Sequence, residues 1–277
     1  MTQLGKSARL RVIKQVPFGV YLDAHELGEV LLPTRYVPAG TRIGDAVDVF
    51  LYLDSEDIPI ATTLKPKVQL GQCAHLLVVA VTPIGAFLDW GLPKDLLVPF
   101  SEQRVPMQEG RSYTVYVYLD EQTGRIAASS KLSHYLRETD DGEFVPDQPV
   151  ELLICGRTEL GLKAVIDGTH LGLIFKDDAL QAVKMGQQVK GYIKAIRDDG
   201  RIDLTLQPAG QQGRDTLDSR ILDFLKAEGG HSTLTDKSTP EAIFKRFGVS
   251  KANYKKALGR LYKARLITLD KEQIRLA

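Results

Sequence analysis

Cysteine is scarce in this sequence, since Cys73 and Cys155 are the only two among 277 residues. Neither has a second cysteine or a histidine at the spacing of a zinc site or a redox motif. We therefore predict no metal site and no cofactor. Both cysteines are expected to be small buried side chains in strands.

Long apolar runs are missing as well. No stretch approaches the roughly 18 apolar residues that a membrane-spanning helix needs, and residues 1–6 lack the apolar segment of a signal peptide. We expect a soluble, cytoplasmic protein without a membrane partner. The sequence also lacks a glycine-rich phosphate loop, a metal-binding motif and a nucleophile motif, so we expect a binding protein and not an enzyme.

Charge of one sign does not dominate the whole chain, which has 36 Lys and Arg, 35 Asp and Glu and a net charge of +1. This balance excludes a nucleic-acid binder that is basic over its whole surface. The balance is uneven, however: residues 1–146 carry 14 basic and 18 acidic residues, 147–214 carry 9 and 9, and 215–277 carry 13 and 8. The C-terminal segment is therefore the part predicted to face phosphate.

What the sequence does contain is an internal repeat with an offset of 66 residues. Pro17–Asp23 (PFGVYLD) matches Pro83–Asp89 (PIGAFLD), and Phe50–Asp54 matches Tyr116–Asp120. Within each copy, short segments of alternating apolar residues are separated by Pro and Gly, a pattern that predicts five strands. In the first copy these are expected at Ala8–Val16, Val20–Asp23, Glu29–Leu32, Val47–Leu53 and Pro59–Thr63.

Five bent strands in about 65 residues are typical of a small closed Greek-key barrel such as the OB-fold. A third, diverged copy fits residues 149–207. The polar stretch 133–149 between the second and third copies is expected to be a linker or a short lid, and residues 208–213 a second linker.

The pattern changes after Asp215. A short amphipathic helix is expected around Ile221–Leu225, a second from Thr239 and Pro240 to Gly248, and a third from Ser250 to about Ala264. A hairpin of Ile267–Leu269 and Gln273–Leu276 follows. Three helices and a hairpin are typical of a winged helix.

These segments resemble known families. PIGAFLD (residues 83–89), LLVPFS (96–101) and GRIA (124–127) resemble the S1-type OB domain, an RNA-binding module. GYIK (191–194), IRDDGRID (196–203), DKSTPE (236–241), FGVSK (247–251) and GRLYK (259–263) resemble the bacterial conserved virulence factor B (YitL-type) family. The resemblance covers essentially the whole chain. It implies a mainly β protein with a small α/β C-terminal domain: S1-like barrels at 1–66, 67–146 (with linker) and 147–208, and a winged helix at 215–277.

The resemblance also implies candidate binding residues. S1-type barrels bind single strands by stacking bases on aromatic side chains. Phe18 and Tyr21 in the first copy, and Phe87 with nearby Trp90 in the second, occupy the positions of such aromatics, although each can also pack in a core. In the third copy, Lys163, Lys194 and Arg197 predict a face that suits phosphate.

A second set of aromatics lies in the fourth strand of the first two copies. Phe50 and Tyr52 alternate with the apolar core residues of that strand, and Tyr116 and Tyr118 repeat the pattern. Both base stacking and packing between barrels fit these positions, and we favour packing.

The third predicted helix of the C-terminal domain carries a basic face. From Lys245 to Arg265 there are eight basic residues and no acidic one. The residues at i, i+3, i+4 and i+7 are expected to face the core, namely Tyr254, Ala257, Leu258 and Leu261. The remaining cations are the candidates for phosphate binding, namely Lys251, Lys255, Lys256, Arg260 and Lys263.

The leading hypothesis is a monomeric RNA-binding protein, a post-transcriptional or translation-associated regulator that prefers single-stranded RNA. Its barrels would bind the strand while the winged helix binds phosphate backbone, with the ribosome or DNA as further candidate partners. Two alternatives stay open: a winged-helix DNA-binding transcription regulator, and a protein-interaction adaptor of the translation or RNA-decay machinery.

Overall fold

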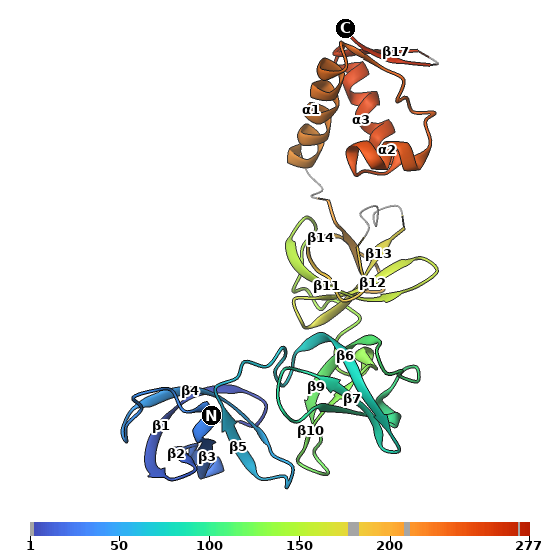
Figure 1. Ribbon diagram of the computed structural model, residues 1–277. Helices are drawn as coiled ribbons and strands as arrows, with labels where there is room; N and C mark the ends of the chain where they lie inside the picture. The colour runs from blue at the N-terminus through green and yellow to red at the C-terminus, as the bar shows by residue number, and fades with distance from the viewer. Residues whose placement is uncertain (1–2, 177–182, 208–210, 271) are drawn as a thin grey trace. The chain divides into compact units, whose positions relative to one another are not determined.

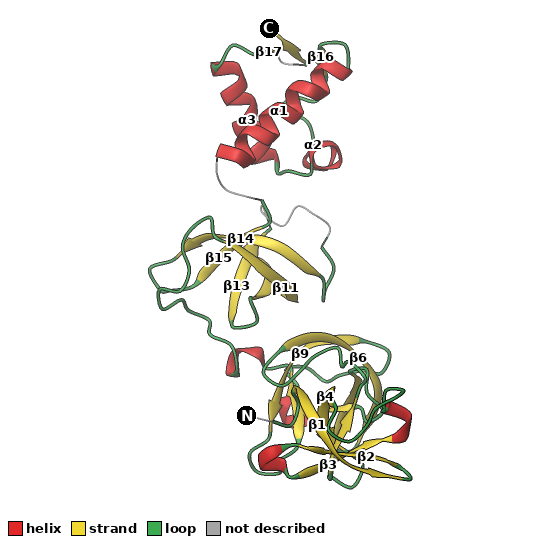
Figure 2. Cartoon of the chain, turned by 90° about the vertical axis from the view of Figure 1, so that its left-hand side faces the viewer, coloured by secondary structure: helices red, strands yellow, loops and turns green. Residues whose placement is uncertain are grey.

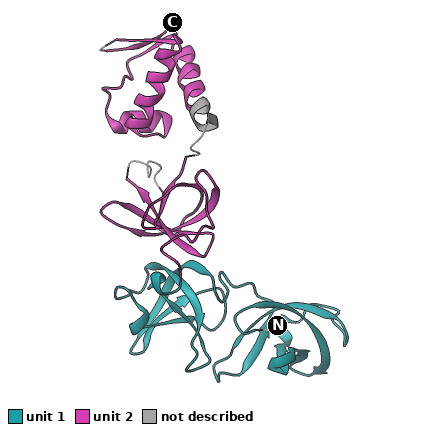
Figure 3. Ribbon diagram, turned by 180° about the vertical axis from the view of Figure 1, so that it is seen from behind, with its two compact units in different colours: residues 1–135 teal, residues 136–277 magenta. Residues whose placement is uncertain are grey.

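The computed structural model describes residues 3–176, 183–207, 211–270 and 272–277. It contains three five-stranded barrels followed by a domain of three helices and a small sheet (Figure 1). The chain divides into two compact units, residues 1–135 and 136–277 (Figure 3). The first unit contains two barrels, and the second contains the third barrel and the helical domain.

The first barrel is closed, with strand order β1-β2-β3-β5-β4. Its core is made by alternate residues of these strands, such as Leu10, Leu22, Leu32 and Leu51, which is the burial that the period-two pattern predicts. The strands are β1 (Ser7–Val16), β2 (Gly19–Asp23), β3 (Glu29–Pro33), β4 (Ala46–Leu53) and β5 (Pro59–Thr62).

The second barrel repeats the first at the predicted offset. The irregularity that bends β1 between Val12 and Lys14 recurs between Val78 and Ala80, 66 residues later. Its sheet has the order β10-β9-β6-β7-β8, and the edge strands β8 and β10 lie side by side. The strands are β6 (Cys73–Thr82), β7 (Gly85–Asp89), β8 (Leu96–Pro99), β9 (Ser112–Leu119) and β10 (Ile126–Ser129).

These two barrels share a hydrophobic core. Phe50 and Tyr52 are 1% and 5% exposed and belong to the apolar cluster of the second barrel. The Phe50 ring meets the ring of Trp90 edge-on, with 5.7 Å between centroids. The prediction that the fourth-strand aromatics pack between barrels is therefore confirmed for Phe50 and Tyr52, whereas Tyr116 and Tyr118 pack against Tyr135 instead.

The third barrel is closed, like the first, with strand order β11-β12-β13-β15-β14. The same bend occurs in its first strand, between Ile154 and Gly156. The strands are β11 (Pro149–Arg157), β12 (Gly161–Ile166), β13 (His170–Phe175), β14 (Gln188–Ile196) and β15 (Ile202–Thr205). The diverged third copy is thus a complete barrel.

The C-terminal domain packs three helices around a common core, with a three-stranded sheet of order β16-β18-β17 (Figure 2). The Thr239 and Ser250 hydroxyls accept hydrogen bonds from the N–H groups of Ala242 and Asn253, which caps the second and third helices. The elements are α1 (Gln211–Ala227), β16 (His231–Ser232), α2 (Pro240–Phe247), α3 (Lys251–Lys263), β17 (Ile267–Leu269) and β18 (Ile274–Leu276).

One boundary differs from the prediction. The first helix, α1, has 17 residues and begins at Gln211, within the stretch expected to be a linker. The apolar positions that predicted this helix begin only at Ile221, so the pattern did not indicate its first part. Residues 208–210 of that stretch lie outside the described residues. None of the helices that the structure describes is long and apolar enough to cross a membrane.

Candidate nucleic-acid interface

One exposed apolar position recurs in all three barrels, immediately before the second strand. Phe18, Ile84 and Leu160 occupy it, and they are 57%, 61% and 60% exposed. Exposed large apolar side chains at one register in three copies form a repeated surface feature, and a scattered exposed residue would not recur in this way.

A glycine positions each of these side chains. Gly19, Gly85 and Gly161 begin the second strand so close to the third that a Cβ atom would lie 2.2, 2.3 and 1.9 Å from the carbonyl oxygens of the third strand. Only glycine permits this approach. The backbone therefore turns sharply at this point, and the preceding side chain is left on the surface.

Two residues after that glycine stands the second predicted stacking position. Tyr21 and Phe87 are half-buried at equivalent places in β2 and β7, each opposite the bend in the neighbouring strand. The ammonium group of Lys14 lies 5.5 Å from the centre of the Tyr21 ring. In the third barrel the same place is taken by Lys163, opposite Gly156.

Trp90 does not lie on this face. It is 3% exposed, its ring packs against Phe50, and its Nε1–H donates a 2.6 Å hydrogen bond to the Lys94 carbonyl. A base cannot stack on a ring that neighbouring side chains cover almost completely. This burial contradicts the expectation that Trp90 acts with Phe87 as a stacking aromatic.

The fourth-strand positions differ between barrels. Tyr116 and Tyr118 in β9 are covered by Tyr135, whose ring stacks on theirs with centroid separations of 4.8 and 5.1 Å. Burial raises the pKa of the Tyr135 hydroxyl well above its ordinary value. The equivalent residues of β14 are the half-buried Tyr192 and the exposed Lys194.

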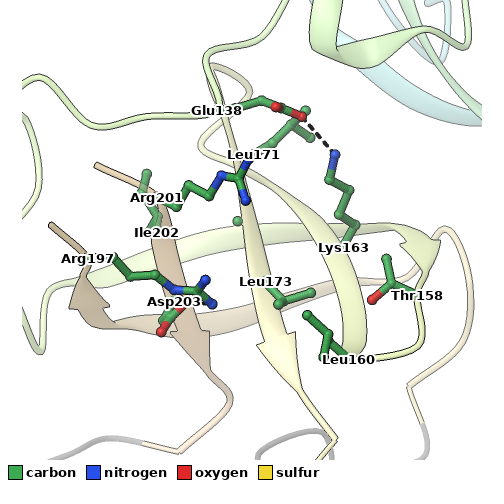
Figure 4. A pocket seen from close by; sticks show the side chains of 11 residues that line it. Glu138, Thr158, Leu160, Lys163, Leu171, Leu173, Arg197, Arg201, Ile202 and Asp203 are labelled. Carbon is green, nitrogen blue, oxygen red and sulfur yellow. Dashed lines mark hydrogen bonds and ion pairs between the residues drawn. The ribbon is translucent and has the colours of Figure 1, made fainter. Parts of the chain in front are cut away.

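The third barrel has a hollow of about 270 Å³ on the face that carries Leu160 and Lys163 (Figure 4). Leu160, Leu171, Leu173 and Ile202 supply apolar surface to the hollow, while cations lie around it. The complete lining is Glu138, Thr158, Leu160, Lys163, Leu171, Gly172, Leu173, Arg197, Arg201, Ile202 and Asp203. Two residues predicted for this face, Lys163 and Arg197, are thus brought together.

Each cation of the hollow has a carboxylate partner. Lys163 Nζ lies 2.9 Å from Glu138 Oε1, and Arg197 Nη2 lies 2.7 Å from Asp203 Oδ1. The hydrogen bond from Lys163 lowers the pKa of the Glu138 carboxyl, and the hydrogen bond to Asp203 raises the pKa of Arg197. The charges of the hollow therefore largely cancel, and Arg201 is the most exposed of them.

Phe175 brings the third predicted cation of this barrel near the same face. The Phe175 ring lies 5.3 Å from the Arg197 guanidinium and 5.8 Å from the ammonium of Lys194. An aromatic ring beside two cations resembles the pairing that proteins use for bases and phosphates together.

In the C-terminal domain, α3 has the orientation that its spacing predicts. Tyr254, Ala257, Leu258 and Leu261 are buried, and Lys255, Lys256 and Lys263 are exposed. Lys251 is half-buried. Lys255 lies 3.8 Å from Asp236, whereas no ion pair of Lys251, Lys256 or Lys263 occurs among the described residues.

Arg260 departs from the predicted basic face. Its guanidinium forms two hydrogen bonds with Asp218 of α1, at 2.6 and 2.9 Å. A paired, partly buried arginine joins the two helices and is a poorer ligand for phosphate than its exposed neighbours. The sequence could not show this contact, because the facing of α1 against α3 depends on packing.

Two residues that sequence reasoning left out lie on these surfaces. Glu138 comes from the stretch expected to be a linker, and no local pattern marks it. Tyr262 is 54% exposed on α3, one turn after Gly259, where a Cβ would have open space around it. The helical spacing of the core residues did leave Tyr262 on the outer face, and this signal could have identified it.

Within the part of the chain that the structure describes, no group of three or more His, Cys, Asp or Glu residues is placed to hold a metal ion. Cys73 and Cys155 lie in β6 and β11 and are half-buried, where full burial was expected.

Comparison with known families agrees with this architecture. Residues 4–64 and 70–131 match the S1 domain, and residues 219–276 match the CvfB-like winged helix domain. The third barrel lies between these matches. The chain therefore combines S1 domains with a CvfB-like winged helix domain, and YitL and conserved virulence factor B are homologues of it over most of its length. Both matching families are families of nucleic-acid-binding domains.

These homologues match this chain over most of their own length. The uncharacterized protein YitL of Bacillus subtilis is 27% identical over 94% of this chain and 89% of its own. Conserved virulence factor B of Staphylococcus aureus (strain N315) is 25% identical over 85% and 80%. The crystal structure of a multidomain protein with nucleic acid binding domains from Streptococcus pneumoniae is 24% identical, covers 100% of this chain and 99% of its own, and has a TM-score of 0.42.

Proposed function

We propose that this protein binds single-stranded RNA in the cytoplasm, as a post-transcriptional or translation-associated regulator. The strand contacts the exposed faces of the barrels, and α3 contacts phosphate backbone. The observation that carries the proposal is the recurrence of an exposed apolar side chain at one register, Phe18, Ile84 and Leu160, in three barrels. The first two of these barrels match the S1 domain, which is a nucleic-acid-binding domain. Such side chains can bind unpaired bases of any sequence, because every base has a flat face that stacks on an apolar surface.

A single strand fits the C-terminal domain better than duplex DNA does. A helix that reads a major groove presents amide or guanidinium groups to base edges. On α3 the amide group of Asn253 donates to Gln207, and Arg260 is paired with Asp218. The exposed residues Lys255, Lys256 and Lys263 match phosphate, and Tyr262 offers a ring.

The test compares ligands on the full chain by fluorescence anisotropy. The probes are a 20-nucleotide oligouridylate, the matching single-stranded DNA, duplex RNA and duplex DNA, each titrated at several salt concentrations. We expect the tightest binding for the single-stranded RNA, with an affinity that falls as salt rises. Preference for duplex DNA, or no binding of any nucleic acid at low salt, would overturn the proposal.

A second candidate function, that of a protein-interaction adaptor, is favoured by one observation. Leu77, Val79 and Val81 form an exposed apolar row on β6, whereas the first barrel has Arg11, Ile13 and Gln15 at those places. An exposed row that is wholly apolar in the second barrel but not in the first fits a protein contact. Nucleic-acid binding that survives changing Leu77 and Val81 to Lys would separate the row from the RNA-binding face.

A further inference from the structure

The segment that enters the second unit lies against the third barrel. The Arg137 N–H donates to the Thr169 carbonyl at 3.1 Å, and the Leu171 N–H donates to the Arg137 carbonyl at 2.8 Å. Three residues later the Asp140 N–H donates to the Gly200 carbonyl at 2.9 Å. This connecting segment, residues 137–144, is thus held on both sides of Glu138.

Because its backbone is held, the connecting segment directs the Glu138 side chain into the hollow of the third barrel. Figure 4 shows Glu138 reaching the ammonium of Lys163, with Arg201 beside it. The carboxylate therefore occupies the cationic end of a hollow whose other side is apolar. This is the arrangement that a nucleotide requires, with its phosphate at the cations and its base on Leu160 and Leu173.

We propose that Glu138 is a built-in competitor of phosphate, which occupies Lys163 in the free protein and must move aside when the third barrel binds RNA. The inference rests on the proposed function, because it concerns the affinity of the third barrel for RNA. Glu138 lowers the affinity of this barrel and makes its binding selective for a ligand that offers both a phosphate and a base.

The strength of the ion pair is suited to displacement. The side chains of Lys163 and Glu138 are 37% and 43% exposed, so their pairing is a weak surface interaction. A phosphate group can replace the carboxylate at small cost. Asp203, the other acid of the hollow, is only 16% exposed and bonds Arg197 through two nitrogens, so it is a structural partner and not a competitor.

The first two barrels have no counterpart of this device. Tyr21 and Phe87 stand where the third barrel has Lys163, so these barrels present a ring at the place where the third presents a cation with its carboxylate.

The test removes the charge of Glu138 in the full chain. We expect Glu138→Gln to bind the 20-nucleotide oligouridylate about three- to tenfold more tightly than the wild type. The logarithmic salt slope should stay the same, because Lys163 contacts one phosphate in both proteins once Glu138 has moved aside. Glu143→Gln is the matched control, since Glu143 pairs with Arg137 of the same segment and does not line the hollow.

A second background distinguishes competition from a general charge effect. In a Lys163→Met protein, Glu138→Gln should improve binding less than twofold, because the contested cation is gone. Thermal melting of every variant checks that the barrel is intact. Equal affinities of Glu138→Gln and Glu143→Gln, or an undiminished gain in the Lys163→Met background, would overturn the inference while RNA binding by the wild type upholds the proposed function. If neither the wild type nor Glu138→Gln binds RNA at low salt, both fail.

Discussion

The first two barrels and the third use the same fourth-strand positions in opposite ways. Phe50 and Tyr52 of β4 are buried against the second barrel, and Tyr116 and Tyr118 of β9 are covered by Tyr135. In β14 the same positions hold the half-buried Tyr192 and the exposed Lys194. One scaffold therefore serves both for internal packing, where the positions are aromatic, and for an open polar surface, where one of them is a lysine.

A parallel difference separates the second strands. Tyr21 and Phe87 present rings in the first unit, and Lys163 presents a cation in the second. If these faces bind one RNA strand, the first two contribute stacking and the third contributes charge. The two contributions respond differently to salt, because stacking releases few counterions and phosphate contacts release many.

The largest effect is expected from removing a side chain of β4 that packs against the second barrel, and this change tests the difference between the barrels most directly. Phe50→Ala leaves a cavity in the shared core and should lower the free energy of unfolding by about 3–5 kcal/mol. The equivalent change in the third barrel, Tyr192→Ala, should cost less than about 1 kcal/mol, because that side chain is half exposed. Urea unfolding measures both, and Trp90, the only tryptophan, reports the first unit by its fluorescence. Similar losses for the two variants would contradict the contrast.

The stacking role of the first barrel can be separated from its stability. Phe18→Ala removes an exposed ring and should weaken binding of single-stranded RNA by about 1–3 kcal/mol, with the salt slope unchanged. Fluorescence anisotropy at several salt concentrations measures both quantities. Ile43→Ala removes another exposed apolar side chain, in the loop before β4, and serves as the control. A loss of slope in Phe18→Ala would show that the residue acts through charge.

The charge role of the third barrel should have the opposite signature. Lys163→Gln with Arg201→Gln should weaken RNA binding by up to about tenfold and reduce the logarithmic salt slope by about 1.4, the value for two phosphate contacts with a single strand. The same anisotropy titration tests this. Lys184→Gln neutralises an exposed lysine of this barrel that does not line the hollow, and it should change neither quantity.

The smallest expected effect concerns pH and the contact between the first two barrels. Asp57 bonds Arg125 and Lys94, and these hydrogen bonds hold the pKa of its carboxyl below the ordinary value of 3.8. A lowered folded-state pKa stabilises the protein above pH 3.8, and this stabilisation is lost as the pH falls through the folded-state value. Asp57→Asn should therefore be slightly less stable than the wild type at pH 6 and equal to it near pH 2. The midpoints of urea unfolding of the two proteins at the two pH values test this prediction. A difference between the midpoints that is the same at both pH values would contradict a stabilising role of the Asp57 carboxylate.

Much of this fold was predictable because its signals are local. The offset of 66 residues, the alternation in each strand and the spacing of Tyr254, Ala257, Leu258 and Leu261 each depend on residues close in the chain, and all three agree with the structure. The start of α1 was missed because Gln211 precedes the apolar positions of that helix.

The candidate sites were less predictable, because they depend on contacts between distant segments. Trp90 has no aromatic equivalent in the first copy, where Ala24 stands, so its burial against Phe50 follows from how the barrels meet. Arg260 bonds Asp218 across two helices, and Glu138 reaches Lys163 across 25 residues. No period or motif carries such pairings.

The shared core of Phe50, Tyr52 and Trp90 has a consequence for the history of the chain. A duplicated segment begins as two interchangeable copies, either of which can be lost or transplanted. Here the outer aromatics of the first copy have become interior residues of the second, so deleting either copy would leave the other with an uncovered apolar surface. The repeat is still visible in the sequence, but neither copy can be lost without exposing apolar surface of the other. The two copies therefore have to be retained together.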